Sequence, residues 1–311
     1  MKHLPILLKR EYWEHPAFWI APAVVFGIVI LGALGGFIQG VGGTIGFTHL
    51  VNGLEMTPEG GRTGVIYATF IGIQSVFLIV MPWVIFFYLL DALFSERKER
   101  HILFWKSLPV SDTETVISKV LTASLVIPVC FFLGVFVTKI VVLILSTLFI
   151  WFGGGSAYEL LWKPAPIFSD VGVSIYTIIA SGLWMLPFTG WLLFASSLAK
   201  KARPFLWAVL TPIFIAMMEG IMFGSNNFVD MIGNYVGSFF ETAFQVGNSD
   251  LNVDIEGWDD LHKLDLPDDF SLTSIINPVG LLSSIKLWVG AALGSAFIAG
   301  AIYLRRYRDD S

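Results

Sequence analysis

The sequence predicts an all-α membrane protein with six transmembrane helices, and three observations support this. The chain has 311 residues, of which 55% are hydrophobic and only 14% are charged, and its mean hydropathy is +0.75. That composition is too apolar for a soluble domain of this length. Six segments have the roughly 20 apolar residues that a helix needs to cross a bilayer, and basic residues gather in alternate connections between them.

The predicted spans follow one another along the whole chain. They cover residues 18–39, 65–90, 120–142 with apolar sequence continuing toward Phe152, 171–198, 205–223 and 287–304. Five prolines fall within spans, where neighbouring helices can satisfy the carbonyl that each proline frees, so we expect kinked helices. These prolines are Pro22, Pro82, Pro128, Pro187 and Pro212.

The basic residues predict the orientation. With the N-terminus in the cytoplasm, 14 of the 19 basic residues face inward, and six crossings return the C-terminus to the cytoplasm. The inward set is Lys2, Lys9, Arg10, Arg97, Lys98, Arg100, Lys106, Lys119, Lys200, Lys201, Arg203, Arg305, Arg306 and Arg308. Only Arg62, Lys163, Lys263 and Lys286 fall in outer connections.

Three connections are predicted to face outward. The first, "GVGGTIGFTHLVNGLEMTPEGGRTG", is glycine-rich and predicted to be a loop, and the second, "GGGSAYELLWKPAPIFSD", is short. The third, 224–284, contains the acidic run "NSDLNVDIEGWDDLHKLDLPDDF", which is either a solvated loop or a face that attracts cations or substrate. Its flanks, "FVDMIGNYVGSFFETAF" and "FSLTSIINPVGLLSS", are apolar but too short to span, which predicts re-entrant or interfacial helices.

The cytoplasmic connection between spans two and three is unusually rich in both charge and aromatic residues. Residues 93–114, "LFSERKERHILFWKSLPVSDTE", place large apolar side chains around a charged middle, and Pro109 ends the helix before it. The pattern predicts a helical extension of the second span followed by a short amphipathic helix. A positive loop with its aromatics in the lipid headgroups would explain the basic residues. A docked protein partner also explains the interleaved Glu96 and Glu99 and the abrupt "SLPVS".

This connection resembles the cytoplasmic signature of the membrane subunits of ABC-type exporters, the ABC-2 permease class. The common form is a span ending in "F..ERE.GT...L..LPVS..E...GK", which "FSERKERHILFWKSLPVSDTETVISKV" follows, with Glu114 and Lys119 at the family positions. Lys98 and Arg100 extend the charged part, and "HILFW" replaces the usual Gly-Thr. The N-terminal "LLKREYWEHPAFW" is similar to the interfacial elbow helix of the same family.

The resemblance implies a single permease domain over residues 1–311, with an elbow helix in 1–17, a coupling helix in 93–114 and a large external connection in 224–284. It implies a homodimer, or a pair with a similar permease, in a prokaryotic plasma membrane, together with two separate ATPase subunits that hold ATP and Mg. The aromatic content of 15% suits an amphipathic or hydrophobic cargo, although it suits contact with lipid equally well. The residues that the resemblance assigns to ATPase coupling are Glu96, Arg97, Glu99, Arg100, Phe104, Trp105, Leu108 and Pro109.

The sequence offers no sign of catalysis in this chain. It contains no G-x-x-x-x-G-K-[ST] phosphate loop, so ATP hydrolysis is expected in a partner, and no G-x-S-x-G, H-E-x-x-H or paired-cysteine pattern predicts a catalytic or metal site. The five histidines all fall outside the predicted spans: His3, His15, His49, His101 and His262. With a net charge of −5, no nucleic-acid partner is implied.

Two ionisable residues lie within predicted spans. Glu219, in "TPIFIAMMEGIMFG", is either a residue of the cargo path or a structural carboxyl bonded to backbone near Pro212 or Gly220. We expect Lys139 to extend along its stem to the outer interface. The alternative function is an ion-coupled secondary transporter that uses Glu219, although no repeat between the two halves of the chain supports it.

Overall fold

The computed structural model describes residues 3–41, 47–57, 59–98, 111–199, 204–245 and 272–307. The described part is helical and has no β-strand, only an isolated bridge between Phe244 and Ile276. The helices are α1 (Leu4–Glu14), α2 (Ala17–Val41), α3 (Phe47–Met56), α4 (Glu59–Ala92), α5 (Phe94–Lys98), α7 (Asp112–Leu121), η1 (Thr122–Val126), α8 (Ile127–Phe152), η2 (Tyr158–Trp162), α9 (Ile167–Trp184), α10 (Leu186–Leu198), α11 (Pro204–Phe223), α12 (Asn227–Ala243), η4 (Leu272–Ile275), α13 (Pro278–Ser283) and α14 (Ile285–Tyr307).

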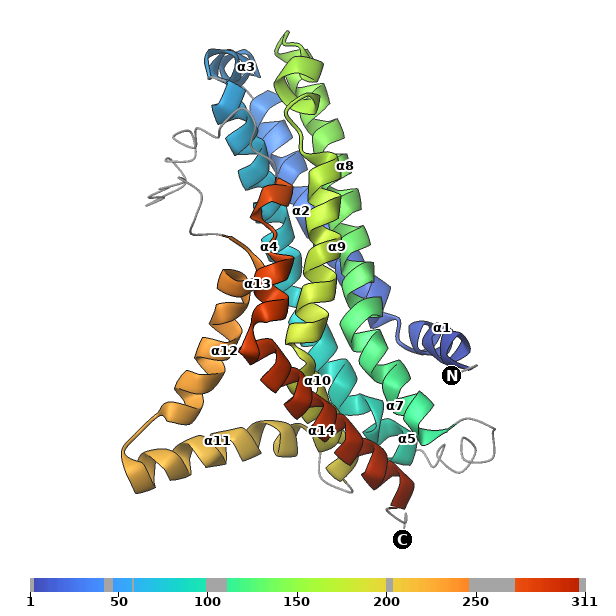
Figure 1. Ribbon diagram of the computed structural model, residues 1–311. Helices are drawn as coiled ribbons and strands as arrows, with labels where there is room; N and C mark the ends of the chain where they lie inside the picture. Colours follow the sequence, from blue (N-terminus) through green and yellow to red (C-terminus); the bar gives the residue numbers. More distant parts are fainter. Residues whose placement is uncertain are drawn as a thin grey trace.

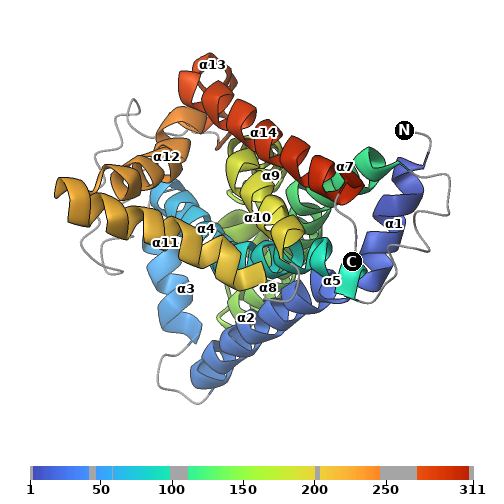
Figure 2. The same ribbon diagram turned by 90° about the horizontal axis from the view of Figure 1, so that it is seen from below.

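The long helices form an upright bundle with a distinct base. Figure 1 shows α2, α4, α8 and α9 running side by side, with α3 and the end of α8 at the top and α5, α7 and the end of α14 at the bottom. Helix α14 crosses the lower half obliquely, and α1 lies beside the base. Seen from below, α1 and the α11–α12 pair stand on opposite sides of the bundle (Figure 2).

Within the described residues, six helical segments are long and apolar enough to cross a membrane, which is the character of a multi-pass membrane protein. They are Ala17–Gln39, Gly60–Glu96, Asp112–Phe152, Tyr158–Trp184, Pro204–Phe223 and Ile285–Tyr307. Five of them contain the spans predicted from the sequence or coincide closely with them. The second and third also extend well beyond the predicted ends, because charged helical turns continue the apolar rods at the base.

The prediction of a continuous fourth span over 171–198 is wrong. The helix breaks at Met185, and the segment long enough to span lies earlier, at Tyr158–Trp184, while α10 is a shorter apolar helix. Pro187 gives the physical reason, since it has no N–H to bond the carbonyl four residues earlier and its ring clashes with that carbonyl. The break therefore places α10 in the base, apart from α9.

The connection between the first two spans, predicted to be a loop, contains helix α3 in its described part. Helix α3 has one apolar face, and its Val51 packs with Ile150 and Leu160 against the C-terminal end of α8. In the connection between the third and fourth spans, η2 forms a turn of π-helix whose Trp162 donates to the hydroxyl of Thr147 at 2.9 Å. The described parts of both connections therefore pack against α8.

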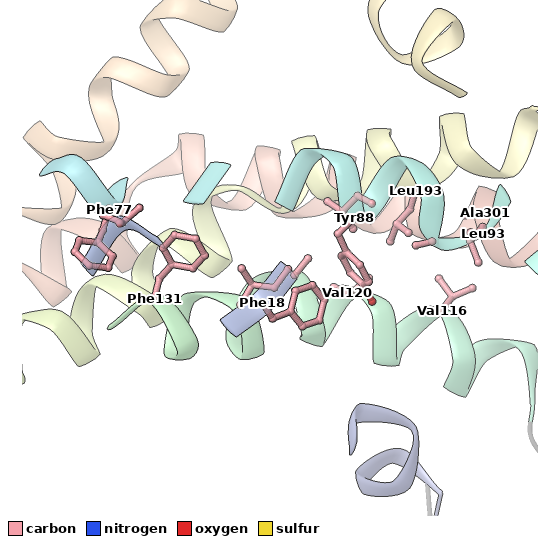
Figure 3. Packing of buried hydrophobic residues seen from close by; sticks show 14 of the residues in the cluster. Phe18, Phe77, Tyr88, Leu93, Val116, Val120, Phe131, Leu193 and Ala301 are labelled. Carbon is pink, nitrogen blue, oxygen red and sulfur yellow. The ribbon is translucent and has the colours of Figure 1, made fainter. Parts of the chain in front are cut away.

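The largest buried apolar cluster joins α2, α4, α7, α8, α10 and α14 along the bundle axis. Figure 3 shows its side chains in a row, from Phe77 and Phe131 through Phe18 to Tyr88 and Val116 near the base. Phe77 and Phe131 meet edge to face with ring centroids 6.4 Å apart, a favoured aromatic geometry. This continuous core joins the base to the upper bundle.

Helices α10 and α14 make the most extensive helix–helix contact, and two glycines allow it. A Cβ on Gly190 would lie 2.5 Å from the carbonyl oxygen of Gly294, and a Cβ on Gly294 would lie 2.6 Å from the backbone of Leu186. The two backbones therefore touch directly, as small residues permit in membrane helix pairs. The pair behaves as a tightly packed unit.

Candidate functional site

A buried network of charged side chains ties the base of the bundle together. Glu11, on α1, has no solvent exposure, and its Oε1 accepts from Lys119 Nζ on α7 at 3.1 Å and from Arg10 at 2.6 Å. Its Oε2 accepts from the hydroxyl of Tyr88 on α4 at 2.8 Å. One carboxylate therefore holds α1 against α4 and α7.

Glu96 is the second centre of this ion network. Its Oε1 lies 3.0 Å from Lys119 Nζ, and its Oε2 accepts from Arg305 in the last turn of α14. The same guanidinium donates through Nε to Asp112 at the start of α7, at 2.9 Å. Three acidic groups, Glu11, Glu96 and Asp112, thus meet three basic groups, Arg10, Lys119 and Arg305. Buried charges are tolerated when paired and bonded in this way.

Local sequence places the two helices that carry these charges. Ser111 caps α7 by accepting from the N–H of Glu114 at 3.2 Å, and Asp112 adds a negative charge to the first turn. On the other side, the hydroxyl of Ser196 on α10 accepts from Leu93 and Phe94 and donates to the carbonyl of Leu90 at 2.7 Å. Helix α5, which precedes residues 99–110, and helix α7, which follows them, are therefore both held in place by hydrogen bonds.

The environment shifts the pKa of groups on and beside α1. Burial alone would raise the pKa of Glu11, but the charges of Lys119 and Arg10 and the bond from Tyr88 outweigh it and hold the pKa below 4.5. Burial lowers the pKa of His15, whose Nε2 lies 3.6 Å from Glu11, below 6.5. These shifts favour the charged form of Glu11 and the neutral form of His15.

The coupling residues predicted from the resemblance fall into two groups. Glu96 is buried, and its carboxylate bonds to residues of this chain, while Arg97 belongs to α5. The others lie outside the described residues, and their predicted role is untested: Glu99, Arg100, Phe104, Trp105, Leu108 and Pro109. Three positions of the signature bond within this chain: Glu96 pairs with Lys119, and Ser111 caps α7.

Glu219 lies near the end of α11 and binds the start of the next helix. Its carboxylate accepts from the hydroxyl of Ser225 at 2.8 Å and from the N–H groups of Asn227 and Phe228 at 2.9 and 2.8 Å. These N–H groups have no partner inside α12, so Glu219 supplies the cap that the side chain of Asn226 does not. The backbone it bonds is that of α12 rather than that near Pro212 or Gly220.

Lys139 does not reach the outer interface, so that prediction is wrong. Its side chain is 2% exposed, and its ammonium donates to both oxygens of Asp170 on α9, at 2.7 and 2.9 Å, and to Gln74 on α4 at 3.1 Å. It also lies 5.0 Å from the ring centroid of Phe70. The ammonium is therefore fully bonded between three helices.

The sequence held a signal for this pair that was missed. Lys139 lies 13 residues before the end of α8 at Phe152, and Asp170 lies 12 residues after the start of the fourth candidate span at Tyr158. At about 1.5 Å per residue Lys139 lies about 20 Å from the end of α8, and its bonds to Asp170 place the first turn of α9 at the same depth. Asp170 was instead placed in the second outer connection. Within the described part of the chain, no three His, Cys, Asp or Glu side chains are grouped to hold a metal ion.

No family model, curated protein or solved structure matches this chain. The resemblance to ABC-2 permeases therefore rests on the sequence stretches quoted above.

Proposed function

We propose that this protein is the membrane-spanning permease subunit of an ATP-driven ABC exporter in a prokaryotic plasma membrane. Two copies, or one copy with a similar permease, pair with two separate ATPase subunits that supply ATP and Mg. Both chain ends face the cytoplasm, and an amphipathic or hydrophobic cargo leaves the cytoplasm or the inner leaflet.

One observation carries the proposal. The stretch 93–114, which carries the signature, begins and ends at the base. There Glu96 pairs with Lys119 of α7 and with Arg305 of the last span. A partner that pushes on this segment would act on α1, α4, α7 and α14 together. That is the mechanical property required of a subunit whose energy comes from outside the chain.

The test replaces both Phe104 and Trp105 with alanine. If these side chains anchor an ATPase, the double variant loses transport, or hydrolyses ATP without transport, because aromatic anchors supply most of the binding energy of an interface. The measurement is ATP-driven cargo movement and ATP hydrolysis in proteoliposomes prepared from the co-purified complex.

The matched control replaces Trp151 and Phe152, two exposed aromatics at the far end of α8, with alanine. This control should leave transport and hydrolysis unchanged, and both variants should insert into membranes normally. Normal coupled transport by the Phe104/Trp105 variant would remove these two residues as anchors. Absence of any ATPase from the purified wild-type complex would remove the proposed function.

The ion-coupled transporter that uses Glu219 has less support, because both oxygens of that carboxylate cap α12. ATP dependence separates the two functions, because an ion-coupled carrier would work without ATP and stop when a protonophore or ionophore collapses the ion gradient.

A further inference from the structure

Two irregular helix geometries meet just above the base. Helices α7 and α8 belong to one continuous rod, Asp112–Phe152, in which Thr122–Val126 is wound as π-helix. The α9–α10 chain breaks at Met185. The two irregularities touch, because a Cβ on Gly182 of α9 would lie 3.0 Å from the carbonyl oxygen of Ser124 and 3.4 Å from its Cβ.

The hydroxyl of Ser124 adds a second observation. It is buried and has no hydrogen-bond partner, whereas most Ser and Thr hydroxyls within long helices bond a carbonyl of the preceding turn. Thr138 and Thr147 in the same rod do so, at 2.6 and 2.9 Å. An unbonded buried hydroxyl is costly, and π-turns recur where helices bend for function.

Below this contact, the base is locked as one body. The ion network joins α1, α5, α7 and α14, Ser196 joins α10 to the α4–α5 junction, and the direct Gly190–Gly294 contact joins α10 to α14. Above it, α8 and α9 are joined by the Lys139–Asp170 pair. Each body has its own buried charges, and the π-turn and the break lie between them. Helix α4 passes through both bodies, bonded above at Gln74 and below at Tyr88, and Pro82 lies between these two residues, where a helix can bend.

We propose that the base and the upper bundle are two rigid bodies that turn relative to each other at a joint made of the π-turn Thr122–Val126 packed on the helix break at Met185. Ser124 and Gly182 form its contact, and Glu96 is the positioning residue that keeps the base rigid. Bending changes the π-turn to regular α-helix and back, which bonds and releases the Ser124 hydroxyl. The part of the proposal in which ATP drives the turn rests on the proposed function.

Spin-label distances in the full chain test the joint directly. In a Cys130→Ser background, Thr113→Cys with Ile144→Cys reports bending of the α7–α8 rod, and Thr113→Cys with Tyr303→Cys reports the base. All three label sites are exposed. In lipid nanodiscs we expect two distances for the rod pair and one for the base pair, and ATP with Mg should change only the ratio of the two rod distances in the ATPase complex.

Gly182→Ala is the matched perturbation, since its methyl would press on Ser124 where the two bodies meet. It should change the ratio of the two rod distances by about fivefold, the scale of mild overpacking. Gly172→Ala is the control on the same helix, because its Cβ would make an ordinary 3.7 Å contact with Thr273. If Gly182→Ala and Gly172→Ala change the ratio of the two rod distances equally, the proposed joint is overturned.

Two further variants test the rigidity of the base. Glu96→Gln should broaden the Thr113–Tyr303 distance and lower the cargo moved per ATP by about tenfold, the loss expected from one charge-assisted bond. Glu14→Gln, whose side chain is 52% exposed at the rim of the network, should do neither. If Glu96→Gln does not assemble, Arg305→Lys keeps the charge but cannot bond Glu96 and Asp112 through two separate nitrogens, and it should show the same loss.

The outcomes separate the inference from the proposed function. Two rod distances with a single base distance in the isolated chain support the joint even if no ATPase co-purifies, a result that would sink only the proposed function. A single unchanged rod distance, or a base pair that moves as much as the rod pair, overturns the joint. Loss of ATPase binding by Glu96→Gln, with the base distance unchanged, would make Glu96 a docking residue and overturn its positioning role.

Discussion

Lys139 is a charged side chain in an apolar helix, and the effect of its burial on stability depends on its partners. Its ammonium has bonds to Asp170 of α9 and Gln74 of α4 and a contact with the ring of Phe70, also of α4. Removing one member of a buried pair leaves an uncompensated charge, whereas removing both leaves none. The double replacement should therefore cost less stability than either single replacement.

We expect Asp170→Leu or Lys139→Met alone to destabilise the protein by about 3 to 5 kcal/mol. The double variant should recover most of that loss, because apolar side chains of similar volume fill the site without a buried charge. The stability of each variant is measured by thermal unfolding in detergent, with the size-exclusion profile as the readout. A double variant as unstable as the sum of the two single variants would contradict the pairing.

Glu219 differs from Lys139, because its carboxylate accepts from backbone N–H groups rather than from an opposite charge. Glu219→Gln retains one acceptor oxygen for the N–H groups of α12, so we expect a small decrease in stability and unchanged transport. Glu219→Leu removes every acceptor and should lower stability further, as loss of a helix cap does. A glutamine variant with normal stability and altered cargo selectivity would instead place Glu219 in the cargo path.

Among the elements, α10 and α14 depend on backbone contact. Gly294→Ala would place a methyl 2.6 Å from the backbone of Leu186, which cannot move like a flexible side chain. We expect a loss of about 1 to 3 kcal/mol, the usual range for overpacking. Gly35→Ala in α2, where a Cβ meets no atom within 4 Å, is the control and should keep wild-type stability. Melting curves of the two variants provide the comparison.

The elements differ in how far the sequence predicts them. Spans are predictable because about 20 apolar residues in a row are a property of one segment alone. The break at Met185 had a visible cause in Pro187, but the same residue type lies inside unbroken helices at Pro22, Pro82 and Pro212. Whether a helix breaks or continues at a proline depends on neighbouring helices, which the sequence does not reveal.

The ion network shows why the candidate site could not be predicted from the sequence. Its bonds join residues 86, 108 and 209 positions apart, so no local pattern contains them. The signature includes Glu96 and Lys119, but the sequence predicts that they face a partner or the cytoplasm. The fold instead turns them toward each other, because burial in an apolar bundle makes an unpaired charge too costly.

For the whole molecule, the distribution of basic residues predicts the topology. A reporter fused after Ser311 should be cytoplasmic, and one inserted near Asp259 should be external, because the basic connections stay inside. The measurement is reporter activity in cells together with protease protection in sealed vesicles. Cleavage near Asp259 from the cytoplasmic side would contradict six crossings with cytoplasmic ends.

The bond between Glu96 and Arg305 also sets an order in time. The two residues are 209 positions apart, so at about 5 to 20 residues per second the ribosome makes Arg305 roughly 10 to 40 seconds after Glu96. Until then, Asp112 lacks the guanidinium that donates to it, and Glu96 has only Lys119 and Arg10 as basic partners. A chain that stops before the last turn of α14 therefore leaves Glu11, Glu96 and Asp112 with only Lys119 and Arg10 to balance them, and we expect the base of such a chain to pack less firmly.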